Sequence, residues 1–473
     1  NVVNYIKAEF VEMKLCEDVD SCGEEIKKKG YRITTTLDHR LQKAAEDITW
    51  RKRKGSVLAP QPDNLMAAMV AIDPKTGQVL AYFGGESGAG HDFAGKNLMN
   101  GELRGGHPPG STFKIFTLAA AVEADIHVES HWNAQEYKIP GTERTVRNAS
   151  RPDCRGGEKW CTLEKSTISS YNVPFYHIAK QIGPDKVVDV AKKAGITMMW
   201  DNDDKPHDLT KLSGEDVAPK YFDNEVGYGQ YAVTVLDQAN AIATFANRGV
   251  YNKAHFVKSV EVKNLETGEW DHVGGEQLNP KRRFKSDVID DVTSVLAKIP
   301  SNNGRSIGYN RPVAGKTGTW ELHNTSENAH AWMVGYTPQI ATAVWVGNEK
   351  EMKPLKDRHG NKVSSGNLPS DIWQRFMTEA HKDQKVEGFA DRKGLGDPNA
   401  GNGEQPPPPE PEEPPCTHPL FCPGGGNGDD DDGNRGRRGR GGGDGGGGGD
   451  GGGGEGGGLG ILPSPSPTTR LRW

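Results

Sequence analysis

Ser111 and Lys114 are the two residues whose types and spacing most directly suggest covalent chemistry. Two prolines and a glycine precede the serine, and an apolar run from Ile115 to Val122 follows it. This pattern predicts a loop that turns into a helix, with Ser111 in the first helical turn. Residues three apart share one face of a helix, so the Lys114 amine can reach the Ser111 hydroxyl. Burial would keep this amine neutral, which a base that accepts the serine proton requires.

Two further motifs decide whether this pair is more than a chance spacing on a solvated helix. Ser170-Tyr171-Asn172 lies just before a helical pattern that begins near Val173, and Lys316-Thr317-Gly318-Thr319 follows a glycine on a predicted strand. Taken singly, the first motif is typical of a helix N-cap, and the second of an edge-strand lysine before a turn. Together and in this order, the three motifs are the set found in serine β-lactamases and penicillin-binding proteins.

The chain therefore resembles the penicillin-binding transpeptidase domain of a bifunctional, class A peptidoglycan synthase. The resemblance covers about residues 30–383 and includes the segments 104–110, 227–249 and 331–347 beside the motifs. In that class a glycosyltransferase domain precedes this region. The sequence is interpreted as a fragment that starts in the interdomain connector. Its cysteine pairs and its tail resemble those of actinobacterial members.

The resemblance implies a catalytic role for five residues. Ser111 attacks the carbonyl of the penultimate D-Ala of a stem peptide, and Lys114 accepts its proton. Ser170 relays a proton towards the leaving D-Ala amine, and Asn172 holds the peptide amide. Lys316 adds positive charge that further disfavours the charged form of Lys114.

The resemblance also implies how the substrate is held. Thr317, Gly318 and Thr319 form the binding strand for the terminal carboxylate, and the backbone N–H groups of Ser111 and Thr319 form the oxyanion hole. An amine of a second stem peptide resolves the acyl-enzyme and gives a cross-link, whereas a β-lactam leaves a slowly hydrolysed acyl-enzyme. The scheme needs no metal and no cofactor.

Two alternative functions remain open from the sequence. A D,D-carboxypeptidase or a β-lactamase-type hydrolase would use water against the same acyl-enzyme. A class A β-lactamase needs a glutamate that positions this water, and the region after Ser170-Tyr171-Asn172 offers no identifiable one. A module that senses β-lactams or cell wall, acylated without turnover, is the other alternative.

The predicted order of helices and strands around these motifs indicates an α/β fold, and the resemblance implies that it is of the penicillin-binding-protein and serine β-lactamase type. Its antiparallel sheet has flanking helices and an inserted helical region, and the serine sits where helix meets sheet. Helices are predicted over 38–53, 111–122, 173–181, 187–194, 233–247 and 369–382, and strands over 31–37, 67–73, 78–83, 313–319, 331–336 and 340–346. Residues 85–107 are predicted to be a Gly-rich loop.

Composition divides the 473 residues into three predicted parts. Residues 1–63 form an interdomain connector, 64–385 the transpeptidase domain, and 386–473 a Pro- and Gly-rich disordered tail. The tail contains an Arg/Gly tract at 435–440, interpreted as solvated linker, with binding of an anionic polymer as the alternative. The sequence contains no run of 18 apolar residues, so we predict no transmembrane helix.

The six cysteines form three close pairs, Cys16 with Cys22, Cys154 with Cys161, and Cys416 with Cys422. Such pairs favour disulfides in an oxidising compartment, and zinc binding is the alternative. We expect an extracytoplasmic location, with membrane anchoring through an N-terminal segment absent from this chain. The expected partners are D-Ala-D-Ala stem peptides, β-lactam antibiotics and other cell-wall enzymes, and not nucleic acid.

Overall fold

The structure is a computed structural model that describes residues 1–404 except 100–101, 155–158, 323–324 and 350–352. The chain divides into two units, Asn1–Pro406 and Pro407–Trp473. The predictions for the Arg/Gly tract and for the pair Cys416 and Cys422 fall in the second unit, which lies outside the described residues. Within the described part, no helix is long and apolar enough to cross a membrane.

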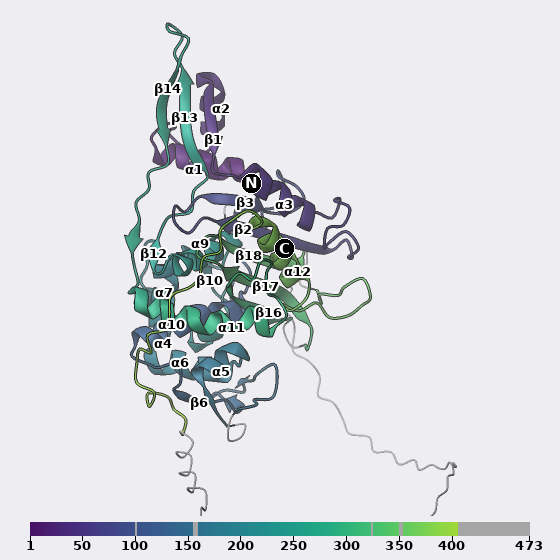
Figure 1. The fold of residues 1–473 in the computed structure, drawn as a ribbon, viewed down its shortest axis with the longest axis vertical. Coiled ribbons are helices and arrows are strands. Elements are labelled where there is room, and N and C mark those ends of the chain that lie inside the picture. The colour runs from purple at the N-terminus through teal and green to yellow at the C-terminus, as the bar shows by residue number, and fades with distance from the viewer. Residues whose placement is uncertain (100–101, 155–158, 323–324, 350–352, 405–473) are drawn as a thin grey trace, which may run out of the picture. The chain divides into compact units, whose positions relative to one another are not determined.

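A five-stranded antiparallel sheet with the order β16-β17-β18-β2-β3 forms the centre of the first unit (Figure 1). Its strands are β2 (Leu65–Ile72), β3 (Val79–Phe83), β16 (Ala314–Glu321), β17 (Asn328–Tyr336) and β18 (Ala341–Asn348). Alternate residues of β2 enter two separate apolar clusters, so Ala68 and Val70 face one core while Ala67 and Met69 face the other. Every residue of β2 is buried, because helices cover both faces of the sheet. This confirms the predicted sheet and its flanking helices.

Different parts of the chain cover the two faces. α9 (Val235–Ala246) packs on β18 and β2 in the first cluster, and α3 (His39–Thr49) and α12 (Leu368–Ala380) pack in the second. The side chain of Asp38 accepts a hydrogen bond from Leu41 N at 2.9 Å and so caps the N-terminus of α3.

The segment between β3 and β16 contains most of the helices and confirms the predicted inserted helical region. Its helices are η1 (Gly110–Phe113, a 3₁₀ turn), α4 (Lys114–Glu123), α5 (Leu163–Ile168), α6 (Val173–Ile182), α7 (Pro184–Ala194), α8 (Gly214–Val217), η2 (Asn224–Tyr228, a 3₁₀ turn), α10 (Ser286–Leu296) and α11 (Lys298–Asn302), together with α9. Short strand pairs interrupt them, namely β6 (His131–Asn133) with β9 (Trp160–Thr162), β7 (Tyr137–Lys138) with β8 (Thr145–Val146), β10 (Met198–Trp200) with β11 (Pro206–Asp208), and β12 (Val250–Tyr251) with β15 (Lys281–Arg282).

Two local predictions in this region were wrong. The predicted loop over 85–107 contains a strand pair, β4 (Lys96–Met99) with β5 (Glu102–Gly105). Its residues have little intrinsic strand preference, and tertiary contacts such as the 2.9 Å hydrogen bond from Lys96 Nζ to Thr197 Oγ1 help to fix it. Ser111 lies in the 3₁₀ turn η1 and not in the α-helix, which begins at Lys114. Tight turns of this kind are frequent at helix N-termini.

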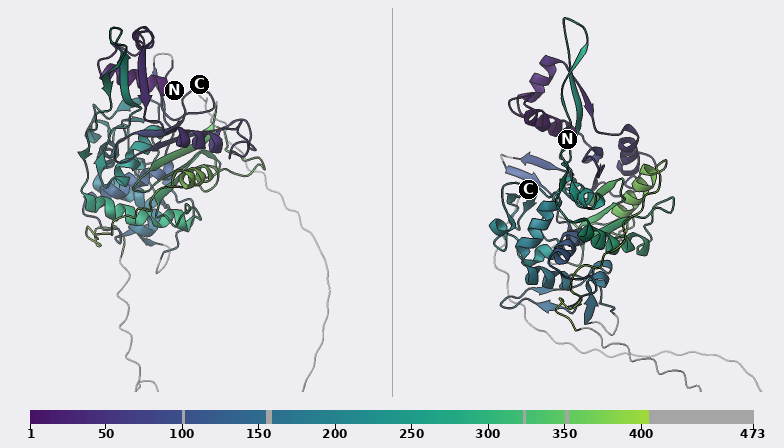
Figure 2. Two further views of the ribbon diagram at one scale, coloured as in Figure 1. Left: turned by 45° about the horizontal axis from the view of Figure 1, so that its top comes forward. Right: turned by 60° about the vertical axis from the view of Figure 1, so that its left-hand side comes forward.

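Residues 1–63 are tied to a distant part of the chain. α1 (Val2–Glu12) and α2 (Cys22–Lys29) precede β1 (Tyr31–Thr35), which pairs with β13 (Val257–Lys263), and β13 pairs with β14 (Trp270–Gly275). Figure 2 shows these elements together at one end of the ribbon. The segment thus shares a sheet with residues 257–275, and its role as an interdomain connector stays a prediction.

Residues 384–404 form an irregular strap across the first unit, although 386 onward was assigned to the disordered tail. The Asp291 carboxylate on α10 is buried and accepts hydrogen bonds from the backbone N–H groups of Lys393, Gly394 and Leu395. The strap continues past residues 125–131, where Gly403 N donates to His131 O at 2.8 Å. A segment poor in apolar residues is held here by backbone hydrogen bonds, which composition does not reveal.

Asp291→Ala should release the strap from α10. Three backbone N–H groups lose a buried carboxylate acceptor, and we expect a loss of about 2–3 kcal/mol in the free energy of unfolding. Hydrogen exchange at Gly394 and Leu395 should become faster, as measured by mass spectrometry. The control is Asp287→Ala, an exposed aspartate on the same helix. Unchanged exchange at these two residues in Asp291→Ala would show that other contacts hold the strap.

Candidate active site

The fold brings the three sequence motifs together around one buried amine. Lys114, the first residue of α4, has its Nζ 2.9 Å from Ser111 Oγ. The same Nζ donates to the backbone oxygen of Ser170 at 2.7 Å and to Asn172 Oδ1 at 2.7 Å. In a 3₁₀ turn, side chains three residues apart eclipse one another, so η1 places Lys114 directly beside the serine. The spacing therefore works as predicted, through a tighter turn than expected.

The surroundings of Lys114 favour its neutral form. The residue is fully buried, and no carboxylate among the described residues hydrogen-bonds to its amine. Burial holds the pKa of Lys114 well below its ordinary value, and the nearby charge of Lys316 lowers it further. These are the two causes expected from the sequence, with burial the larger.

Ser170 links the two lysines. Its backbone is in the left-handed region, with a φ of 61°, which is uncommon for a residue with a side chain. Its carbonyl faces Lys114, while its Oγ accepts from Lys316 Nζ at 2.8 Å. Lys316 is fully buried on β16, and burial lowers its pKa to about 7. The strained conformation thus supplies each lysine with an oxygen from one residue.

The edge strand β16 carries the third motif against η1. A Cβ at Gly318 would collide with the carbonyl oxygen of Pro109, so only glycine permits this close approach. Thr317 and Thr319 are partly exposed, on either side of this contact. The backbone of Gly110 lies against that of Thr319, since a Cβ on Gly110 would be 3.1 Å from Thr319 N. The two predicted oxyanion-hole residues, Ser111 and Thr319, therefore lie beside each other.

Two residues with a place in this site were missed from the sequence. Ser365 Oγ accepts a hydrogen bond from Thr319 Oγ1 at 3.0 Å, and Ser365 N donates back to Thr319 Oγ1 at 3.2 Å. Asn148 Oδ1 accepts from Asn172 N at 2.7 Å. Neither residue belongs to a local motif, and each lies more than 20 positions from its partner. No pattern in the sequence pointed to them.

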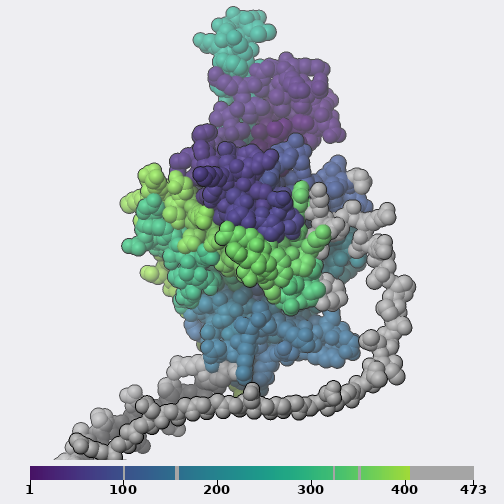
Figure 3. Space-filling view, turned by 90° about the vertical axis from the view of Figure 1, so that its right-hand side faces the viewer, coloured from purple at the N-terminus to yellow at the C-terminus, as the bar shows by residue number. Residues whose placement is uncertain are grey.

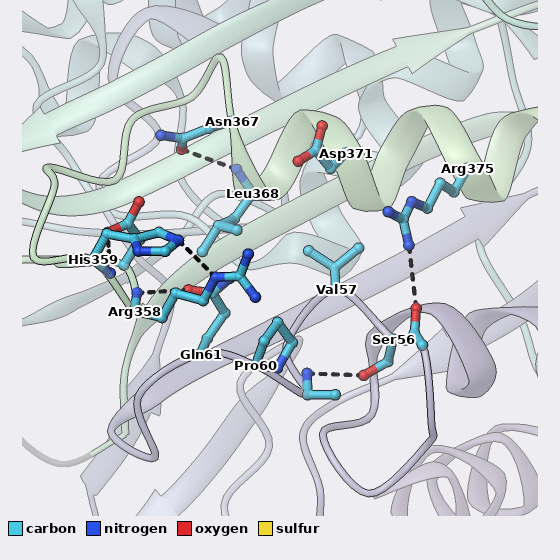
Figure 4. Close-up of a pocket in the computed structure, with 13 residues that line it drawn as sticks. Ser56, Val57, Pro60, Gln61, Arg358, His359, Asn367, Leu368, Asp371 and Arg375 are labelled. Carbon is cyan, nitrogen blue, oxygen red and sulfur yellow. Dashed lines mark hydrogen bonds between the residues drawn. The ribbon is translucent and has the colours of Figure 1, made fainter.

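A surface hollow of about 700 Å³ lies apart from the three motifs. It is lined by the segment 55–61, by residues 357–359 and by the start of α12, and Figure 4 shows Arg358, His359 and Arg375 at its wall. Figure 3 shows the indigo surface near residues 40–60 bordering the green surface near 353–375. None of the predicted site residues lines this hollow. The arrangement of the three motifs, and not this hollow, defines the candidate site.

The cysteines of the described residues are paired. Cys16 with Cys22 and Cys154 with Cys161 form disulfides, so these four residues are not zinc ligands. The part of the chain that the structure describes contains no group of three His, Cys, Asp or Glu residues arranged to hold a metal ion.

This fold and this site define a penicillin-binding transpeptidase domain. Residues 67–367 match the family of the penicillin binding protein transpeptidase domain, and the chain belongs to that family. The resemblance drawn from the three motifs is thereby confirmed.

Two proteins with similar sequences come from mycobacteria. Penicillin-binding protein 1A of Mycolicibacterium smegmatis is 34% identical over 409 residues, which cover 86% of this chain and 48% of that protein. Penicillin-binding protein 1A of Mycobacterium tuberculosis is 34% identical over 374 residues, covering 77% of this chain and 42% of that protein. The chain thus spans about half the length of these relatives.

Solved structures confirm the predicted fold class. The penicillin-binding protein PonA1 from Mycobacterium tuberculosis is similar to this chain with a TM-score of 0.71 and 30% identity. The match covers 87% of this chain and 98% of that one. The structure of PonA1 in complex with penicillin V matches with a TM-score of 0.70.

Lys316→Met tests how the buried amine of Lys316 makes the free energy of unfolding depend on pH. The pKa of Lys316 is about 7 in the folded protein, against about 10.4 for lysine in an unfolded chain. Between these values the unfolded state binds a proton that the folded state does not. The free energy of unfolding of the wild type should therefore rise with pH relative to Lys316→Met, by at most about 1.4 kcal/mol per pH unit.

Urea unfolding of both proteins from about pH 7 to about pH 9 measures this gap. The exposed Lys27→Met serves as the control, and its difference from wild type should stay flat. If the difference between Lys316→Met and wild type also stays flat, Lys316 does not lose its proton in this range.

Proposed function

We propose that this domain is a serine D,D-transpeptidase that cross-links peptidoglycan stem peptides through an acyl-enzyme on Ser111. The observation that carries the proposal is the fully buried Lys114 amine, 2.9 Å from the Ser111 hydroxyl. A serine needs an adjacent base to become a nucleophile, and an amine kept neutral by burial is such a base.

The hydrogen-bond partners of Lys114 support this direction of proton transfer. A neutral amine has two N–H donors and one lone pair. The Ser170 carbonyl is only an acceptor, and Asn172 presents its oxygen, because Asn172 Nδ2 donates to the Arg147 carbonyl at 2.8 Å. These two oxygens take both N–H groups. The lone pair is then left for the hydroxyl proton of Ser111.

The reaction then proceeds in two stages, acylation of Ser111 and transfer of the acyl group to an amine. Ser111 Oγ bonds to the carbonyl carbon of the penultimate D-Ala as its proton moves to Lys114. The tetrahedral oxyanion accepts hydrogen bonds from the N–H groups of Ser111 and Thr319. The C–N bond breaks, and the proton passes through Ser170 to the leaving D-Ala amine. An acceptor amine next attacks the ester carbon, and its proton goes to Lys114. The C–Oγ bond then breaks as Lys114 returns this proton to Ser111 Oγ, which restores the serine hydroxyl and the neutral lysine.

Substrate binding is proposed for the β16 edge. Thr317 and Thr319 offer two partly exposed hydroxyls to the terminal carboxylate of the donor peptide, and Gly318 allows β16 to approach η1. Both ends of the Asn172 amide are engaged by protein groups, and these contacts support a role in orienting Lys114. Holding the peptide amide, the role that the resemblance implies for Asn172, stays a prediction.

A hydrolase remains the second candidate, and the geometry favours it less. No carboxylate in the described part of the chain hydrogen-bonds to Ser111, Lys114, Ser170 or Asn172. A water-positioning glutamate of the class A β-lactamase kind is therefore not in contact with these residues. A sensing module would keep the same acylation chemistry, and only turnover separates it from an enzyme.

The cellular setting is likewise a proposal. The two disulfides support an oxidising, extracytoplasmic compartment. Membrane anchoring through a further segment, action together with other cell-wall enzymes, and inhibition by β-lactams all follow from the family. They concern whole proteins of the length of the mycobacterial relatives, of which this chain spans about half.

Ser111→Ala tests the nucleophile directly. A fluorescent penicillin should label the wild type covalently and should fail to label Ser111→Ala, as seen on a denaturing gel. Ser87→Ala, an exposed serine on a separate loop, is the control and should label like wild type. Covalent labelling of Ser111→Ala would contradict the assignment.

The products with a D-Ala-D-Ala stem peptide and an amine acceptor distinguish the candidates. Release of D-Ala with a new cross-linked amide is the outcome expected here. A shortened peptide alone would identify a hydrolase, and labelling by penicillin without any peptide product would identify a sensing module.

A further inference from the structure

Helix α6 begins at an asparagine that does not cap it. Asn172 occupies the N-cap position, where an asparagine side chain ordinarily accepts a hydrogen bond from the first turn. Here the Asn172 side chain makes no such bond, and its Oδ1 faces Lys114 Nζ at 2.7 Å. The first N–H groups of a helix need an acceptor from elsewhere when their own cap is turned away.

Asn148 provides this acceptor from a distant part of the chain. Its Oδ1 accepts from Asn172 N at 2.7 Å and from Val173 N at 3.0 Å. Its Nδ2 donates to the carbonyl of Ala134 at 2.6 Å. Both ends of the amide therefore have a matching partner, which fixes the orientation of the Asn148 side chain.

The residue before Asn148 holds the other end of Asn172. The carbonyl of Arg147 accepts from Asn172 Nδ2 at 2.8 Å, which turns the oxygen of that amide towards Lys114. Two consecutive residues thus hold both the backbone and the side chain of Asn172. They follow directly on β8, so their backbone is fixed by a strand pair.

The support beneath this contact is built into the same region. Ala134, which anchors Asn148, packs with Tyr171 and with the disulfide-bonded Cys154 and Cys161 in one small buried cluster. The Tyr171 hydroxyl accepts from Asp153 N at 2.9 Å. The middle residue of the Ser170-Tyr171-Asn172 motif and the anchor of Asn148 therefore belong to the same buried cluster.

We propose that Asn148 is a positioning residue for the acylation step, which acts as a substitute N-cap of α6 and so releases Asn172 to orient Lys114. The inference rests on the proposed function and names a residue outside its three motifs. Without Asn148, the N–H groups of Asn172 and Val173 lose their acceptor, so the backbone that places the Asn172 oxygen beside Lys114 is no longer held. Lys114 would then lose one of the two acceptors that direct its lone pair to Ser111.

Rates of acylation by a fluorescent penicillin test this link. Asn148→Ala should slow acylation roughly 10- to 100-fold, the scale expected when a catalytic group is misplaced. Asn148→Asp keeps oxygen acceptors for both N–H groups but loses the donor to the Ala134 carbonyl, so it should recover part of the rate. Ser150→Ala, an exposed change two residues away, is the control and should match wild type.

The double variant separates positioning from a general loss of structure. If Asn148 acts through Asn172, then Asn148→Ala with Asn172→Ala should acylate no more slowly than Asn172→Ala alone. Multiplied losses in the double variant would overturn the inference. So would a wild-type rate in Asn148→Ala, or a failure of Asn148→Asp to recover when its thermal unfolding matches wild type. Absence of labelling in the wild type would instead overturn the proposed function itself.

Discussion

The buried amine of Lys114 is the constraint on which the rest of this site depends. An amine removed from water must find acceptors for its N–H groups, and it remains neutral only if no carboxylate pairs with it. The protein meets both conditions with oxygens from one loop, at Ser170 and Asn172. The left-handed backbone of Ser170 and the Asn172 side chain that does not cap α6 are local departures from ordinary geometry that serve this purpose.

The second lysine acts less simply than the sequence suggested. Lys316 was expected to keep Lys114 neutral by its charge, and its charge does lower the pKa of Lys114. Burial nevertheless brings the pKa of Lys316 itself to about 7. Near neutral pH the charge of Lys316 is therefore partial. Desolvation is thus the main cause of the neutral base.

The motifs and the sheet were predictable because their signals are local. Ser-x-x-Lys, Ser-x-Asn and Lys-Thr-Gly each lie within four residues, and the strands are short apolar runs between turn residues. Asn148, Ser365 and the strap were not predictable, since each depends on a partner far away in the chain. The strap shows this most clearly. Its composition favours disorder, yet the buried Asp291 carboxylate accepts hydrogen bonds from its backbone N–H groups.

The pH dependence of acylation tests the central claim, that Ser111 is activated by a neutral Lys114. The second-order rate constant with a fluorescent penicillin should rise with pH and reach its plateau well below about pH 10.4, the ordinary pKa of a lysine. Lys114→Met should remove the pH-dependent rise together with nearly all labelling. A rate that keeps rising to the ordinary lysine pKa, or a Lys114→Met variant that acylates like wild type, would contradict the account.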